Sequence, residues 1–217
     1  MTDESLPAEH LSALATLVDD VLARLGYEMA AAIDAIDDAV SGYGGLFDPT
    51  TTRVELQEAL ERLLASELTR PPVPVPASDE LVLYVDGSSR GNPGPAGAGA
   101  VILDTAGDEL ARLGRPVGAR TGNNTAEYVA LQLGLSQLLA RYTPRSLEVR
   151  IDSMTVIRGV WRGNDPTEPG METYSKAIME ALSSVPDHRY THLADSNPNP
   201  ADALATVGAD IATFGPG

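Results

Sequence analysis

The chain of 217 residues is 43% hydrophobic and has no cysteine, which allows a catalytic domain with a small extra module and excludes disulfide bonds and thiolate metal sites. No apolar run is long enough to cross a membrane, and the first residues lack the pattern of a signal peptide, so we expect a cytoplasmic protein with no membrane partner. The formal net charge of -16 excludes a protein that attracts nucleic acid through an overall positive charge.

Residues 1–69 are predicted to form an acidic, all-α N-terminal region. Apolar side chains recur every three or four residues from Leu11 to Val40, and Thr52 with Glu55 forms the capping pattern that begins a further helix. The region has neither a basic stripe nor an aromatic platform, so we do not expect it to bind nucleic acid. A small helical bundle is one interpretation. We favour a unit for homodimerisation or for docking a protein partner, because the helices are short and the apolar stripe is narrow.

A proline-rich segment at 70–79 is predicted to be a stiff linker before a second domain at 80–214. In this domain three strands come first, and helices and strands then alternate. The predicted strands lie at 81–85, 98–103, 109–117, 147–151 and 190–193. The predicted helices lie at 125–141, 170–184 and 200–213, and a further short helix follows the fourth strand and ends at about Trp161. The order predicts an α/β fold, a mixed five-stranded sheet flanked by helices and preceded by the small all-α region.

Four carboxylates fall where these predicted elements begin or end. Asp86 and Asp152 end the first and fourth strands, which lie side by side if the sheet is wound in the usual way. Glu127 and Asp202 fall in the first turns of two helices. Carboxylates gathered in one place need a cation, and oxygen ligands without Cys select Mg²⁺ or Mn²⁺. In so acidic a chain each acid alone is better explained as a helix cap or strand end than as a metal ligand, so spacing alone leaves the metal site undecided.

Four segments resemble, in family order, the motifs of the type 1 ribonucleases H. They are 85–102 (VDGSSRGNPGPAGAGAVI), 122–131 (GNNTAEYVAL), 150–160 (RIDSMTVIRGV) and 192–205 (HLADSNPNPADALA). Together they are far more specific than one short motif. The resemblance covers most of 80–210. It implies the ribonuclease H fold and an endonuclease that cuts the RNA strand of RNA–DNA hybrids, leaving 5′-phosphate and 3′-hydroxyl ends.

The resemblance also implies roles for single residues. The implied metal ligands, for two Mg²⁺ or Mn²⁺ ions per site, are Asp86, Glu127, Asp152 and Asp202. His192 is implied to assist proton transfer or product release. The residues implied to contact the hybrid are Gly87, Ser88, Ser89, Asn92, Arg120, Asn123 and Met154. Two departures bear on substrate binding: Gly122 stands where some relatives have a phosphate-binding Thr, and the loop at 194–200 differs from that of relatives.

The acidity of the chain does not exclude a nucleic-acid partner. Lys176 is the only lysine, and an excess of carboxylates with almost no lysine suits a salt-rich cytoplasm, so we hypothesise a halophilic source. At roughly 1 M salt the Debye length is about 3 Å, so overall repulsion largely disappears. Binding would then depend on metal bridges and short hydrogen bonds.

Two alternatives to the ribonuclease H interpretation are open from the sequence. A 3′-5′ exonuclease of the same superfamily is disfavoured by the DGSSRGNPGP turn, because those enzymes begin with a DxE-type strand. A non-catalytic hybrid-binding or scaffold protein is disfavoured by the four intact acids.

Overall fold

The computed structural model describes residues 11–42, 44–162, 171–194 and 196–214. The strands are β1 (Glu80–Ser89), β2 (Gly94–Asp104), β3 (Glu109–Thr121), β4 (Ser146–Ile151) and β5 (Asp187–His192). The helices are α1 (Ala13–Arg24), α2 (Met29–Ala39), α3 (Arg53–Ala65), α4 (Asn123–Arg141), α5 (Met154–Trp161), α6 (Met171–Ser183) and α7 (Asp202–Ala212). None of these helices is long and apolar enough to span a membrane, a finding that covers the described ranges only.

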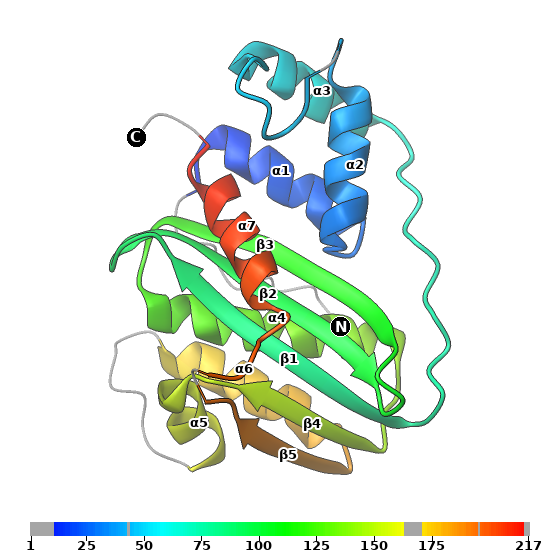
Figure 1. The fold of residues 1–217 in the computed structure, drawn as a ribbon, viewed down its shortest axis with the longest axis vertical. Coiled ribbons are helices and arrows are strands. Elements are labelled where there is room, and N and C mark those ends of the chain that lie inside the picture. Colours follow the sequence, from blue (N-terminus) through cyan, green and yellow to red (C-terminus); the bar gives the residue numbers. More distant parts are fainter. Residues whose placement is uncertain (1–10, 43, 163–170, 195, 215–217) are drawn as a thin grey trace.

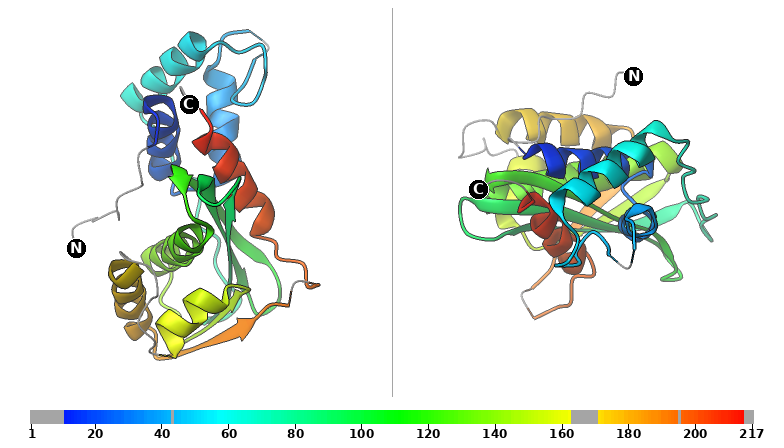
Figure 2. Two further views of the ribbon diagram at one scale, coloured as in Figure 1. Left: turned by 90° about the vertical axis from the view of Figure 1, so that its left-hand side faces the viewer. Right: turned by 90° about the horizontal axis from the view of Figure 1, so that it is seen from above.

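The five strands form one mixed sheet in the order β3-β2-β1-β4-β5 (Figure 1). The first three strands pair antiparallel, whereas β1, β4 and β5 run parallel. Helices α4 and α6 cover one face of the sheet and α7 lies on the other (Figure 2). Alternate side chains of β1 point to opposite faces, and Leu81, Leu83 and Val85 join the core under α4. The predicted mixed five-stranded sheet with flanking helices is therefore confirmed.

Helix α7 lies directly on β2 because glycines leave room for its backbone. A Cβ atom on Gly97 would lie 2.1 Å from the Ala209 nitrogen, and one on Gly99 would lie 2.3 Å from the Ala201 oxygen. Such contacts are far below the separation that real Cβ atoms allow, so only glycine permits this approach. The axis of α7, whose first residue is Asp202, is thereby placed relative to the sheet.

The N-terminal helices pack at one end of the sheet, against α7 and β3 (Figures 1 and 2). Thr52 caps α3 through the predicted capping box with Glu55. The apolar stripe of α1 and α2 is buried in a cluster that also contains Val101 of β2 and Leu204 and Ile211 of α7. The stripe is therefore covered by other parts of the same chain. It no longer supports the hypothesis that a second copy or a protein partner covers it.

Polar contacts join the same helices to the domain that carries the sheet. The Arg115 guanidinium of β3 lies 2.7 Å from the Asp19 carboxylate of α1, and both side chains are largely buried. Arg141 of α4 pairs with Glu28 at 2.5 Å. Glu28 also forms a β-bridge with Leu113, which covers part of the edge of β3. Beyond α3, the segment that includes the predicted linker runs down one side of the molecule to β1 without helix or strand (Figure 1).

Candidate active site

Two of the predicted acids come from the neighbouring parallel strands β1 and β4. The register pairs Tyr84 with Arg150, so Asp86 and Asp152 each follow two residues later, on adjacent strands. Asp152 directly follows β4, as predicted. The prediction that Asp86 ends its strand is wrong, because β1 continues to Ser89 through antiparallel pairing with β2. The carboxylate nevertheless lies where β4 has ended, at an open position of the sheet.

Glu127 reaches the same place from α4. This helix begins at Asn123, earlier than predicted, so Glu127 lies in its second turn and not in its first. Helix α4 passes very close to β1, where a Cβ on Gly87 would lie 2.4 Å from the Glu127 nitrogen. The Gly87 amide donates to Glu127 Oε2 at 3.1 Å, and Asn123 Nδ2 donates to Oε1 at 3.5 Å. Both carboxylate oxygens are therefore oriented by neighbours on β1 and α4.

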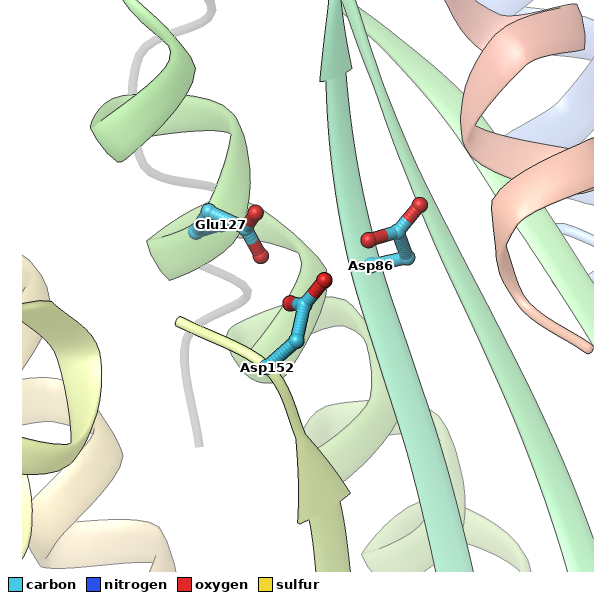
Figure 3. A group of neighbouring side chains, drawn as sticks. All are labelled: Asp86, Glu127 and Asp152. Carbon is cyan, nitrogen blue, oxygen red and sulfur yellow. The ribbon is translucent and has the colours of Figure 1, made fainter. Parts of the chain in front are cut away.

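Asp86, Glu127 and Asp152 converge on one point (Figure 3). One carboxylate oxygen from each lies within 4.8 Å of the others. Asp86 and Glu127 are 7% and 5% exposed, and Asp152 is more accessible. Asp202, in the first turn of α7, joins from the other side of Asp86, with which it shares a side-chain hydrogen bond. We call these four residues the carboxylate cluster.

The electrostatics of the carboxylate cluster require positive charge. Burial, together with the charges of Asp152 and Asp202, raises the pKa of Asp86 from its ordinary value of 3.8 to about 7. Burial and the charges of Asp86 and Asp152 also raise the pKa of Glu127 well above its usual range. Ionising these buried acids is unfavourable unless a cation lies between them. Carboxylate oxygens that converge in this way are the ligands that Mg²⁺ or Mn²⁺ prefers. The residues present are thus compatible with the predicted metal.

Metal-free protein is expected to lose stability as pH rises from about 4 to about 7. Over this range the folded protein keeps a proton on Asp86, whose pKa is about 7, while the unfolded chain, with an ordinary pKa of 3.8, has lost it. An asparagine has no proton to lose over this range. The melting temperature of Asp86→Asn is therefore expected to fall less, or rise more, between about pH 5 and about pH 8 than that of the parent. Differential scanning calorimetry in EDTA measures it, and identical pH dependence in both proteins would contradict the prediction.

His192, the last residue of β5, lies beside the carboxylate cluster. Its Nε2 atom is 3.1 Å from the backbone oxygen of Asp152, and its side chain is exposed. The imidazole is thus next to the acids and accessible to a substrate, as a group that moves protons needs to be. Its catalytic role remains a prediction.

The residues predicted to contact substrate fall into two groups. Asn92 Oδ1 accepts from the Asn123 amide at 3.3 Å, and Ser89 Oγ donates to the Thr121 carbonyl, also at 3.3 Å. These bonds tie the end of β1 and the turn after it to the last residue of β3 and the first residue of α4, close in sequence to Gly87 and Ser88.

The second group lies further out. Arg120 is exposed near the end of β3. Met154 begins α5 shortly after Asp152 and packs against the apolar core. Contact of any of the seven residues with a nucleic acid remains a prediction.

Sequence reasoning missed Asn199, in the loop that leads into α7. Its side chain accepts from the Ala201 amide at 3.1 Å and donates to the Val85 carbonyl at 2.9 Å. An Asn just before a predicted helix does signal a local turn with the amide two residues later. The long-range bond to β1 has no signal in the sequence.

Comparison with known proteins assigns the fold to a family. A family model described as reverse transcriptase-like matches residues 84–208. A ribonuclease HI of Halobacterium salinarum is 37% identical over 132 residues, which are 59% of this chain and 64% of the relative. The chain thus spans less than two thirds of that relative's length.

Solved structures give the same result. RNase H1 from the halophilic archaeon Halobacterium salinarum NRC-1 is 34% identical with a TM-score of 0.55, over 60% of this chain and 98% of that one. LC11-RNase H1 in complex with RNA/DNA hybrid is 31% identical with a TM-score of 0.55, over 60% of this chain and 97% of that one. The mixed five-stranded sheet with flanking helices agrees with these matches. This chain belongs to the ribonuclease H family, and the family model that it matches is described as reverse transcriptase-like.

Proposed function

We propose that this protein is an endonuclease that hydrolyses the RNA strand of RNA–DNA hybrids with two Mg²⁺ or Mn²⁺ ions held by the carboxylate cluster. The observation that carries the proposal is the convergence of three carboxylate oxygens within 4.8 Å, two of them on buried side chains. Burying several negative charges together destabilises a fold unless a cation compensates them. Raised pKa values of this kind are common for acids at functional sites.

The chemistry divides between the ions and the chain. Bound divalent ions would activate water and stabilise charge on the phosphate and on the departing 3′-oxygen. Asp86 is central in the carboxylate cluster and would hold the metal together with Glu127, Asp152 and Asp202. His192 is placed to accept or deliver a proton near Asp152. Hydrolysis by this route leaves 5′-phosphate and 3′-hydroxyl ends.

The hybrid is the proposed partner because of what lies around the acids. LC11-RNase H1 has been solved with an RNA/DNA hybrid, and its similarity covers most of the sheet-bearing domain. In this chain Asn92 and Asn123 lie together beside Glu127, as small amides suited to 2′-hydroxyl and base-edge contacts in a minor groove. With a net charge of -16, the grip on the hybrid depends on such contacts and on the ions more than on a basic face.

A cleavage assay tests the proposal. The full chain is incubated with end-blocked, labelled RNA–DNA hybrid, double-stranded RNA or DNA, in Mg²⁺ or Mn²⁺, over a KCl series up to roughly 1 M. We expect internal cuts in the RNA of the hybrid, abolished by EDTA and restored by either ion. Requirement for a free end would indicate the exonuclease alternative, and binding without cleavage would indicate the scaffold alternative. Full activity in dilute buffer would count against the halophile hypothesis.

For residues 1–69, homodimerisation or docking of a protein partner remains a proposal. The strongest remaining support is the exposed Phe47, which is 45% accessible beside Phe214, and Val54, which is 65% accessible on α3. Light scattering after size-exclusion chromatography tests self-association directly. A monomer at every concentration and salt would remove the dimer and leave docking to be tested by capture of defined partners.

A further inference from the structure

The fourth acid of the carboxylate cluster reaches it by a different route from the other three. Asp86 and Asp152 come from neighbouring strands, and Glu127 comes from the helix on the α4 face. Asp202 is the first residue of α7, and this helix lies on the opposite face of the sheet (Figure 2). Its carboxylate is next to that of Asp86, and the side-chain hydrogen bond between the two is lost whenever both acids are ionised. The start of α7 therefore needs a tether to hold Asp202 in place.

The glycine contacts of α7 do not supply this tether by themselves. Gly97 and Gly99 set how closely the helix lies on β2, and they contact Ala209, Ala205 and Ala201. The N-cap residue of α7 is Ala201, whose methyl side chain cannot accept a hydrogen bond from the first turn. The direction of the first turn must be set by the preceding loop.

Asn199, in that loop, contacts the residue before Asp86 and the residue before Asp202. Its Nδ2 donates to the carbonyl of Val85, the residue before Asp86, at 2.9 Å. Its Oδ1 accepts from the amide of Ala201, the residue before Asp202, at 3.1 Å. Its backbone oxygen accepts from the Asp202 amide at 3.2 Å. One carboxamide thus spans the backbone on both sides of the Asp86–Asp202 pair.

The bond to Val85 falls where the sheet changes. Pairing between β1 and β4 runs only as far as Tyr84 and Arg150, one residue before Val85. Beyond this point β1 is paired with β2 alone, and its other side faces the place where the acids lie. A neutral carboxamide is suited to bridge there, because it donates and accepts at once without adding charge to the acids.

We propose that Asn199 is a positioning residue that holds Asp202 against Asp86 and so sets the affinity of the site for divalent metal. The inference rests on the proposed function of the carboxylate cluster as a metal site. Without the carboxamide, the first turn of α7 loses its tether to β1, and Asp202 can turn away from Asp86 while the body of α7 remains seated on Gly97 and Gly99. Orienting groups of this kind typically change metal affinity or activity by about 10- to 100-fold.

The test compares Asn199→Ala with Asn197→Ala, a matched change at an exposed position of the same loop. Mn²⁺ is titrated into each metal-free protein, with free Mn²⁺ followed by electron paramagnetic resonance. In Asn199→Ala we expect the dissociation constant to rise by about tenfold or more and the Mg²⁺ needed for half-maximal cleavage to rise in parallel. The KM for hybrid and the melting temperature change little, and Asn197→Ala behaves like the parent.

A second variant separates the two bonds of the side chain. Asn199→Ser can still accept from the Ala201 amide but is too short to reach the Val85 carbonyl. The proposal expects it to bind Mn²⁺ as weakly as Asn199→Ala. Parental Mn²⁺ affinity in folded Asn199→Ala or in Asn199→Ser would overturn the inference. Failure of the parent itself to bind Mn²⁺ or to cut hybrid would instead overturn the proposed function.

Discussion

Asp152→Asn is expected to reduce hybrid cleavage by at least about a hundredfold, since even residues that only support metal ligands cost about 10- to 100-fold. The change keeps the shape of the side chain and removes the charge that would hold the cation. The same charge raises the pKa of both Asp86 and Glu127, so its removal relieves repulsion among buried acids. The metal-free variant is therefore expected to melt at the same or a higher temperature than the parent.

Lower activity with unchanged or higher stability indicates that a metal ligand was lost, whereas a destabilised fold would lower both. Single-turnover cleavage and calorimetry in EDTA measure the two effects. Asp38→Asn, the same substitution at an exposed position of α2, is the control and is expected to leave both unchanged. Cleavage by Asp152→Asn within about tenfold of the parent is incompatible with a metal ligand.

Gly87→Ala is expected to destabilise the protein by about 2–3 kcal/mol and to reduce cleavage by about a hundredfold. The added Cβ would lie 2.4 Å from the Glu127 nitrogen and 2.5 Å from the Ala126 carbonyl carbon. These are backbone atoms of α4, so the clash is relieved only if the helix moves away from β1. That movement also lengthens the bond from the Gly87 amide to Glu127 Oε2 and displaces a carboxylate from the cluster.

Urea unfolding gives the stability change. Gly122→Ala serves as the control for stability, because the nearest atom to its Cβ is Asn92 Oδ1 at 3.3 Å and its φ of -75° is allowed for alanine. We expect that control to unfold close to the parent. Stability of Gly87→Ala within about 0.5 kcal/mol of the parent would show that α4 and β1 are not held in close contact.

Much of the architecture is readable from local pattern. The alternation of apolar residues and the turn chemistry predict each strand and helix of the sheet-bearing domain, because these signals depend on neighbours within one turn or one strand. Boundaries fail where pairing extends an element. The glycine-rich end of β1 reads as a turn, yet antiparallel pairing with β2 carries the strand to Ser89. Helix α4 likewise begins at Asn123, before the first apolar residue of its pattern.

The sequence by itself determined the family, through motifs that place Asp86, Glu127 and Asp152 on particular elements, because motif and chain order are properties of the linear chain. Only the tertiary structure decided where the acidic N-terminal stripe is buried, since Val101 and Leu204 that cover it are distant in sequence. It also decided how Asp202 is held. The bond from Asn199 to Val85 joins residues that are 114 positions apart, and no local periodicity records a contact made by packing a helix on the far face of a sheet.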